Sequence, residues 1–204
     1  MSNGTIETDV LIVGAGPVGL FLANECARRG FRWRLVEMRS AQSEHSKALA
    51  IMPRTLEIFD MAGVVAPFLE AANRVTSAAI IAHGRRLARM QFTPADTPYP
   101  FIAMVPQDVT ERLLVAELRR KNGTVEYETT FVSAVQLDDH VSATLDHHGE
   151  RVELNAKFVV GCDGAHSTIR HLLNLPFEGA QYEAMFLLAD VETNETLPAD
   201  ALPE

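Results

Sequence analysis

Three glycines near the amino end of the chain have the spacing of a phosphate-binding turn. Gly14, Gly16 and Gly19 follow the apolar run at residues 10–13 and open a helical apolar pattern that begins at Pro17. The first glycine permits a tight turn, the second lacks a Cβ that would block a pyrophosphate, and the third lets helix and strand approach closely. The N–H groups and positive dipole end of that helix would stabilise the phosphate charge.

A carboxylate stands where a dinucleotide-binding fold needs one. Glu37 ends a second predicted strand, close to the offset of roughly twenty residues expected of an acid that accepts hydrogen bonds from a ribose diol. Its charge would repel the extra phosphate of NADP. Strand, glycines, helix, strand and acid in this order therefore indicate a site for the adenosine half of FAD or for NAD.

The elements that must position these residues alternate between strands and helices. Gly30 ends a helix over 17–29, and the βαβ unit is completed by a strand over 32–37. Further segments are predicted as a helix from Pro53 to Gly63, two short strands within 77–92, a helix over 107–123, an antiparallel meander over 125–154, a separate buried strand from 157, and a short helix capped by Ser167. The pattern predicts an α/β class: a Rossmann-like domain with a small antiparallel meander, plus part of a β-rich domain.

Composition limits the other classes of function. The 204 residues are 47% hydrophobic, ample for a core, and the net charge of −9 disfavours nucleic acid or an anionic membrane as a partner. The amino terminus lacks signal-peptide architecture and no apolar stretch could span a bilayer, so we expect a cytoplasmic location. We interpret Cys26 and Cys162 as reduced structural thiols, and His147 and His148 as turn residues rather than metal ligands.

Four segments in order resemble one family. "GCDGAHSTIR", residues 161–170, resembles the D-G motif of the FAD-dependent aromatic hydroxylases, the single-component flavoprotein monooxygenases related to para-hydroxybenzoate hydroxylase. "SKALAIMPRTLEIF" and "VPQDVTERLL" are similar to two segments that lie between the glycine motif and the D-G motif in that family. The similarity spans residues 9–170 and includes features of the phenol and hydroxyphenylpropionate hydroxylases.

The resemblance implies a set of cofactor-binding residues. Gly14, Gly16, Pro17 and Gly19 would belong to the pyrophosphate turn, and Glu37 would hold the adenosine ribose. The remaining members of the set would be Arg39, Lys47, Gln107, Val132, Asp163 and Gly164. Among these, Gln107 would reach the flavin side and Val132 would contact adenine through its backbone. Asp163 and Gly164 would lie near the pyrophosphate and the groove for the nicotinamide donor.

Two positions depart from the family pattern. The family commonly has an arginine directly after the ribose acid, where this chain has Met38 and then Arg39. It also commonly has an arginine at the loop position of Lys47, and lysine keeps the charge without the planar fork for phosphate. Arg54 could compensate or could serve only the surface of its helix.

The implied reaction is carried largely by FAD. A hydride would pass from NADH or NADPH to FAD, and one oxygen atom of O2 would be transferred to a phenolic ring. No catalytic residue is assigned, because the polar aromatic candidates His83, Tyr99, His166 and Tyr182 each favour a structural role. Asp108 and Glu111 lie near a helix N-terminus, where acids more often offset the dipole than act in catalysis.

The resemblance also predicts two domains, an FAD-binding domain and only part of a substrate-binding domain. An FAD-binding domain would comprise residues 1–75 and 101–176, and 76–100 with 177–204 would form part of a substrate-binding domain. The second FAD signature of the family, a Gly-Asp-Ala-Ala-His-like segment, does not occur in these residues. An incomplete sheet would leave edges for a missing carboxy-terminal half or a homodimer to cover. The alternatives are thus an aromatic monooxygenase, an inactive FAD- or nucleotide-binding module, and a related flavin reductase or halogenase.

Overall fold

The computed structural model describes residues 5–43, 48–83, 85–92 and 96–179. The chain divides into two compact units, one of residues 1–49 with 106–175 and one of residues 50–105 with 176–204. Helices and strands occur in both, so the predicted α/β class is confirmed. The assignment of 1–75 and 101–176 to an FAD-binding domain, and of 76–100 and 177–204 to a substrate-binding domain, stays a prediction.

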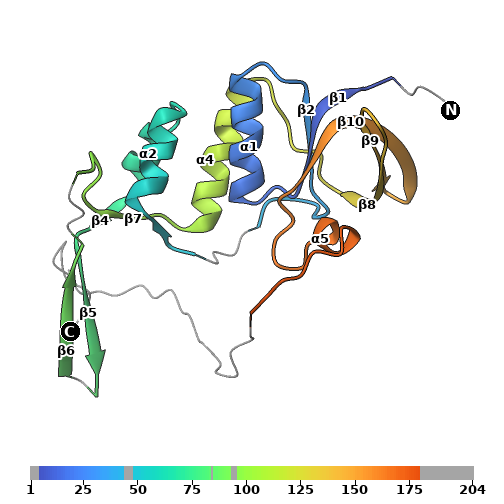
Figure 1. The fold of residues 1–204 in the computed structure, drawn as a ribbon. Coiled ribbons are helices and arrows are strands. Elements are labelled where there is room, and N and C mark those ends of the chain that lie inside the picture. Colours follow the sequence, from blue (N-terminus) through green and yellow to red (C-terminus); the bar gives the residue numbers. More distant parts are fainter. Residues whose placement is uncertain (1–4, 44–47, 84, 93–95, 180–204) are drawn as a thin grey trace. The chain divides into compact units, whose positions relative to one another are not determined.

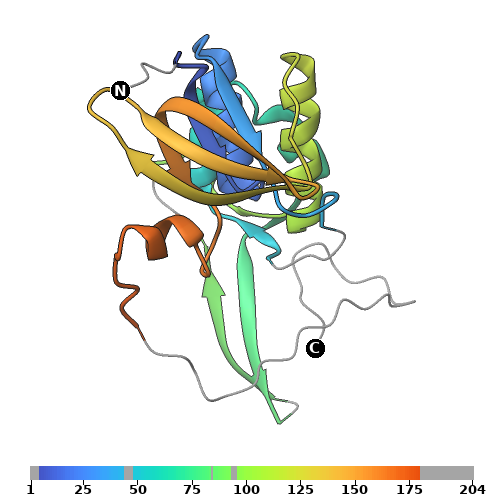
Figure 2. The same cartoon turned by 90° about the vertical axis from the view of Figure 1, so that its right-hand side faces the viewer.

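The first unit is built on one five-stranded sheet in the order β2-β1-β10-β9-β8. Its strands are β1 (Thr8–Val13), β2 (Trp33–Val36), β8 (Thr129–Gln136), β9 (Val141–His147) and β10 (Glu150–Gly161). β1 runs parallel to β2 and β10, whereas β8, β9 and β10 form the predicted antiparallel meander. Helices α1 (Pro17–Arg28) and α4 (Gln107–Arg120) lie side by side on one side of this sheet (Figure 1, Figure 2).

One strand joins the meander to the parallel sheet. The sequence predicted two strands in this region, a meander strand at Val152 and Leu154 and a separate one from Lys157, and this prediction is wrong. Residues 150–156 of β10 pair antiparallel with β9, and residues 156–161 pair parallel with β1. The partner changes at Ala156 without a turn, so the two apolar stretches belong to one element. The stretch from Lys157 is not buried as predicted, because Phe158 is exposed and Val159 and Val160 are only partly buried.

The sheet curls until β8 returns beside β2. The Glu37 N–H donates to the Glu126 carbonyl at 2.9 Å, and the Thr129 N–H donates to the Glu37 carbonyl at 3.0 Å. The curled sheet surrounds a hydrophobic core. Its buried residues are Leu11, Val13, Val36, Phe131, Ala143, Leu145, Leu154 and Ala156. The start of β8 is thereby held next to the carboxyl end of β2.

Two glycines allow the backbone segments around the first turn to meet. Gly14 has φ +101°, and a Cβ there would lie 2.5 Å from the carbonyl oxygen of Cys162. A Cβ on Gly19 would lie 1.9 Å from the carbonyl oxygen of Gly14. The predicted roles of these glycines, a tight turn and close approach of helix and strand, therefore match the backbone geometry.

The second unit contains the elements between the two halves of the first. It has helices α2 (Pro53–Met61) and α3 (Ala66–Ala71), a small sheet of β3 (Ala50–Ile51), β4 (Asn73–Val75) and β7 (Ile102–Met104), and a hairpin of β5 (Ser77–Ala82) and β6 (Arg85–Gln91). The hairpin confirms the two strands predicted within 77–92. Helix α3 and the strands of the small sheet were not predicted, because elements of two to six residues carry too little periodicity.

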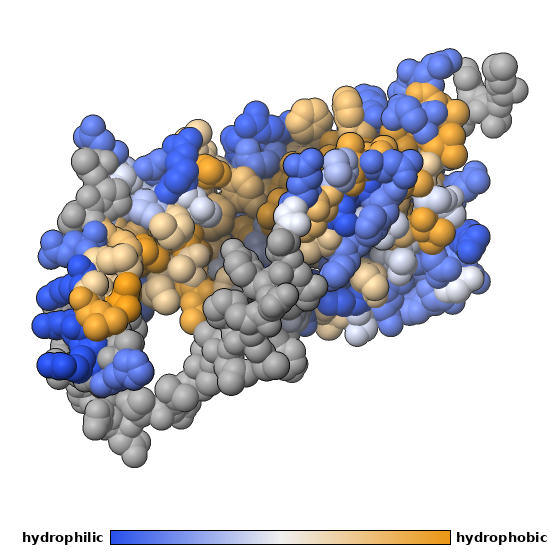
Figure 3. All heavy atoms as spheres, turned by 60° about the horizontal axis from the view of Figure 1, so that its bottom comes forward, coloured by the Kyte–Doolittle hydropathy of each residue, from blue (hydrophilic) through white to orange (hydrophobic). Residues whose placement is uncertain are grey.

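Apolar side chains reach the surface as well as the core. Figure 3 shows them in orange between polar side chains on the face in view. The most exposed include Val18, Met38, Met61, Leu87 and Phe158, which is 65% exposed on β10. No helix in the described part of the chain combines the length and apolar composition that crossing a bilayer requires.

The glycine contacts predict a stability difference between two alanine substitutions. We expect Gly19→Ala to destabilise the protein by about 3 kcal/mol or more, since its Cβ would overlap the Gly14 carbonyl and backbone cannot easily yield. Gly16→Ala serves as the matched control, because a Cβ there meets no atom within 4 Å. Urea unfolding at equal protein concentration measures both. Equal stability of the two variants would show that the helix does not need this close approach.

Candidate functional site

The carboxyl ends of β1, β2 and β10 open into a cavity of about 480 Å³ within the first unit. Parallel strands place their following loops at one edge of the sheet, which is where open α/β sheets bind ligands. The lining residues are Val13, Gly14, Gly16, Pro17, Val18, Val36, Glu37, Met38, Arg39, Gln107, Glu111, Thr129, Thr130, Phe131, Cys162, Asp163, Gly164 and Thr168. They come from five segments that the fold brings together.

The amino end of α1 supplies the region suited to a phosphate. Gly16 is the N-cap residue, Pro17 occupies the first turn, and α1 continues for 12 residues. Pro17 has no N–H and its fixed φ suits a helix start. A Cβ on Gly16 would meet nothing within 4 Å, so the glycine leaves free space at the wall of the cavity. An anion there would face the positive end of the helix dipole.

Glu37 is a buried carboxylate that accepts hydrogen bonds from Ala15 and from Arg39. Its Oε2 accepts from the Ala15 N–H at 2.8 Å, and its Oε1 accepts from the Arg39 N–H at 3.0 Å and Nε at 2.9 Å. Burial alone would raise the pKa of Glu37, but the hydrogen bonds from Arg39 and Ala15 outweigh it and hold the pKa below its ordinary value. Glu37 is therefore ionised at neutral pH and ties β2 to the glycine turn.

Helix α4 contributes two polar side chains one turn apart. Gln107 begins the helix, and its Nε2 donates to Oε1 of Glu111 at 2.9 Å. Glu111 is only 2% exposed. Its other oxygen, Oε2, is buried and has no hydrogen-bond partner within the described ranges. Such an orphaned acceptor next to a cavity is costly and calls for a donor.

The loop after β10 contributes a second carboxylate of this kind. Oδ2 of Asp163 accepts from the Thr168 N–H at 2.7 Å, at the start of α5 (Thr168–Leu172). Its Oδ1 is buried without a hydrogen-bond partner in the part of the chain that the structure describes. Cys162 also lines the cavity, and burial followed by the charge of Asp163 raises the pKa of this thiol. Cys162 is a free cysteine.

The structure brings most of the predicted cofactor residues together. Those that line the cavity are Gly14, Gly16, Pro17, Glu37, Arg39, Gln107, Asp163 and Gly164. Gly19 packs against the Gly14 carbonyl instead, and Val132 lies where the pairing of β8 and β9 shifts register, beside the lining residue Phe131. Lys47 lies outside the described residues. Binding by each of these residues remains a prediction.

Sequence reasoning missed several lining residues. Glu111 was interpreted as a charge that offsets the helix dipole, yet it is buried and faces the same cavity as Gln107. The sequence spacing could have indicated this, because Gln107 and Glu111 are four residues apart and such residues lie on the same face of a helix. Thr129, Thr130 and Phe131 could not be found in this way, since only the return of β8 to β2 places them there.

The other candidates in the described residues are not among those that line this cavity. His83 and His166 are exposed, and Tyr99 is buried in the second unit. Arg54 pairs with Glu57 of its own helix at 2.7 Å, which agrees with a helix-surface role. Tyr182 lies outside the described residues. No group of three or more potential metal-ligating side chains occurs in the portion that the structure describes.

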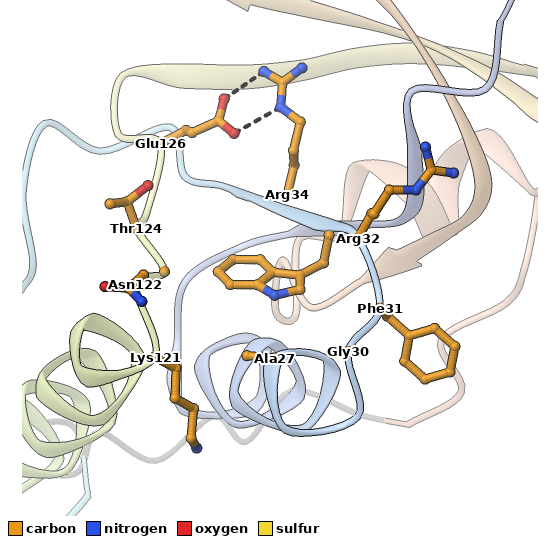
Figure 4. A pocket seen from close by; sticks show the side chains of 11 residues that line it. Ala27, Gly30, Phe31, Arg32, Arg34, Lys121, Asn122, Thr124 and Glu126 are labelled. Atoms are coloured by element: carbon orange, nitrogen blue, oxygen red, sulfur yellow. Dashed lines mark hydrogen bonds and ion pairs between the residues drawn. The ribbon is translucent and has the colours of Figure 1, made fainter.

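A second cavity of about 400 Å³ lies at the amino end of β2 (Figure 4). It is lined by Arg32, Arg34 and Lys121, so it has cationic walls. Each cation already has a carboxylate, however: Arg34 binds Glu126 through two nitrogens, Arg32 pairs with Asp9, and Lys121 pairs with Glu117. This cavity lies at the opposite end of β2 from the glycine turn, and among the described residues none of its three cations is left unpaired for an anion.

Fold and site together define a dinucleotide-binding domain of the α/β class. A family model described as FAD binding domain matches residues 7–202, and the chain belongs to this family. A relative from Streptomyces rimosus, 12-dehydrotetracycline 5-monooxygenase/anhydrotetracycline 6-monooxygenase, is 34% identical over 198 residues, covering 93% of this chain and 37% of the relative. The predicted resemblance to FAD-dependent aromatic hydroxylases is confirmed.

Solved structures show the same fold. The p-nitrophenol 4-monooxygenase PnpA from Pseudomonas putida DLL-E4 matches with a TM-score of 0.81 and 30% identity, over 87% of this chain and 46% of that one. Aklavinone-11 hydroxylase, solved with FAD and aklavinone, matches with a TM-score of 0.74 and 31% identity, over 84% of this chain and 35% of that one. The chain spans 37–39% of the length of the first curated relatives that it matches.

The residues present fit FAD, the cofactor of the family. The free space at Gly16 and the amino end of α1 suit a pyrophosphate. The buried acceptors on Glu111 and Asp163 suit hydroxyl or N–H donors, which the sugar and ring parts of a dinucleotide carry. Asp163 lies beside the glycine turn, where a Cβ on Gly14 would come within 2.9 Å of its Cα, whereas Glu111 belongs to helix α4. A phosphate placed against Glu111 would be repelled.

The depressed pKa of Glu37 predicts a pH-dependent contribution to stability. A carboxyl whose folded pKa lies below its unfolded value of about 4.3 stabilises the fold above that pH and loses this contribution as pH falls through the folded pKa. We expect Glu37→Gln to cost about 1–3 kcal/mol at pH 7, with the difference from wild type shrinking below about pH 4.

Chemical unfolding at pH 7 and below pH 4 measures this difference. Glu153→Gln, an exposed position on β10, is the control and should follow the wild type at both values. A Glu37→Gln penalty that is the same at both pH values would contradict the assigned charge state.

Proposed function

We propose that the chain is the FAD-binding part of a flavin-dependent monooxygenase that hydroxylates a phenolic or other aromatic substrate. The observation that carries this proposal is the cavity in which Gly16, Glu37 and Asp163 meet at the carboxyl ends of β1, β2 and β10. The relatives named above, 12-dehydrotetracycline 5-monooxygenase/anhydrotetracycline 6-monooxygenase and p-nitrophenol 4-monooxygenase, support the aromatic class. A pentachlorophenol 4-monooxygenase from Sphingobium chlorophenolicum is also 30% identical over 180 residues.

Each wall of the cavity has a proposed task. Gly14, Gly16 and the amino end of α1 hold the pyrophosphate, while Glu37 holds the adenosine ribose. Gln107 lies on the flavin side, and Asp163 with Gly164 lies near the pyrophosphate and the groove for the nicotinamide donor. The bound FAD supplies the redox chemistry, with NADH or NADPH as electron donor and O2 as oxygen source. The chain's own residues bind, orient and keep water away.

A second candidate function is a binding module without catalysis. The cavity described above accounts for nucleotide binding without assigning a catalytic residue, and the chain spans 37–39% of the length of the first curated relatives. A module would bind FAD or another adenine nucleotide through the glycine turn and perform no hydroxylation. Both candidates therefore predict that the chain binds FAD, but only the monooxygenase predicts hydroxylation of a substrate.

Titration of the chain with FAD, followed by the absorbance and fluorescence of the flavin, tests binding. We expect saturable binding that Gly16→Val weakens by roughly 100-fold or more, because a branched side chain would fill the space that a pyrophosphate needs. Ala116→Val, an exposed position on α4 outside the cavity, is the matched control and should bind as the wild type does. Binding unaffected by Gly16→Val would remove the glycine turn from the site.

Oxidation of NADH or NADPH in the presence of FAD, O2 and a phenol separates the candidates. A monooxygenase consumes the nicotinamide faster when the phenol is added and forms a hydroxylated product, detected by mass spectrometry. Nicotinamide oxidation without that product would indicate a reductase. FAD binding without nicotinamide oxidation would indicate the binding module.

A further inference from the structure

The cavity contains a buried carboxylate that the proposed cofactor contacts do not use. Glu111 is 2% exposed and lines the cavity, and its Oε2 has no hydrogen-bond partner among the described residues. Its Oε1 accepts from Gln107, so the side chain is oriented from within α4. A buried acceptor without a donor costs about 1–3 kcal/mol, which makes a ligand donor the natural partner.

The neighbouring carboxylate is already supplied with donors. Both oxygens of Glu37 accept hydrogen bonds, from Ala15 and from Arg39. These bonds fix the side chain and neutralise much of its charge. A carboxylate oxygen can accept more than one hydrogen bond, so Glu37 can still receive a ligand hydroxyl, but Glu111 offers an oxygen that no other group in the described residues occupies.

The charges of Glu111 and Glu37 both favour the protonated form of Arg39. The pKa of Arg39 is raised above its ordinary value, first by its hydrogen bond to Glu37 and also by the charges of Glu37 and Glu111. Burial raises the pKa of the Tyr127 hydroxyl, and the charges of Arg39, Glu37 and Glu111 all reach it as well. Glu111 lines the same cavity as Glu37 and Arg39, at the carboxyl end of β2, which is the end proposed for the adenosine ribose.

The chemistry of the donor follows from these charges. Glu111 and Glu37 together would repel a phosphate, and Arg39 already interacts with Glu37. A neutral group with hydroxyl donors satisfies an ionised carboxylate without adding negative charge, and charge-assisted hydrogen bonds of this kind are stronger than neutral ones. A ribose diol meets both requirements.

We propose that Glu111 is a second acceptor for the adenosine ribose, binding a hydroxyl of the diol through Oε2 while Gln107 holds Oε1. This inference rests on the proposed function, because it takes FAD as the ligand. It adds a binding residue on α4 to the acid at the end of β2. The ribose would then lie between β2 and α4, and its two hydroxyls would donate hydrogen bonds to two carboxylates, Glu37 and Glu111, rather than to one.

A thermodynamic cycle between the protein and the ribose hydroxyls tests this contact. ADP and 2′,3′-dideoxy-ADP are measured as competitors of FAD on the wild-type chain and on Glu111→Gln, which keeps the side-chain shape and an oxygen for Gln107. The wild type should prefer ADP. We expect Glu111→Gln to reduce this preference by about tenfold, the effect of losing one charge-assisted hydrogen bond.

Glu117→Gln is the matched control on the same helix. Glu117 pairs with Arg120 and Lys121 and does not line the cavity, so its loss should leave the preference for ADP unchanged. Thermal unfolding of both variants shows whether they fold. The wild-type measurement needs no variant, and equal binding of ADP and the dideoxy compound by the wild type would by itself overturn the proposal.

The remaining outcomes separate this inference from the proposed function. If FAD binds but Glu111→Gln keeps the full preference for ADP, the contact with ribose is wrong and FAD binding stands. If Glu111→Gln instead weakens FMN while sparing ADP, the donor belongs to the ribityl chain and the ribose assignment is overturned. If the wild-type chain binds neither FAD nor ADP, the proposed function fails and this inference with it.

Discussion

The close approach of three backbone segments at the first turn is the constraint on which the site depends. Gly14 allows the turn to touch the Cys162 carbonyl, and Gly19 allows α1 to touch the Gly14 carbonyl. A side chain at either position would push apart the glycine turn, the helix or the loop after β10. Because these segments meet, the amino end of α1 and the carboxylate of Asp163 reach the same cavity.

Charge is distributed along that cavity in a way that separates two kinds of ligand group. The amino end of α1 presents N–H groups and a positive dipole beside the free space at Gly16. At the carboxyl end of β2, Glu37 is ionised and Arg39 interacts with it directly. One molecule with a phosphate part and a hydroxyl-rich part complements both regions, and a simple anion complements only the first.

The long strand β10 connects the antiparallel meander of the first unit to its parallel strands. Its first half closes the meander that supplies Phe131, and its second half lies beside β1 and leads into Asp163. The adenosine side and the pyrophosphate side of the proposed site are therefore linked through one continuous strand. The family membership and the neighbouring structures extend this arrangement to flavin-dependent monooxygenases that are longer than this chain.

The sequence by itself determined the glycine turn, the acid at Glu37, the main helices and the family, because these depend on local spacing and on residue types with few alternatives. It also placed Gln107 and Asp163 by resemblance. The tertiary structure was needed to show that β10 is a single strand, that β8 returns to β2, and that Glu111 is buried with one oxygen that no described residue satisfies. Pairing partners and burial depend on residues distant in the chain, and no local pattern encodes which distant groups will meet.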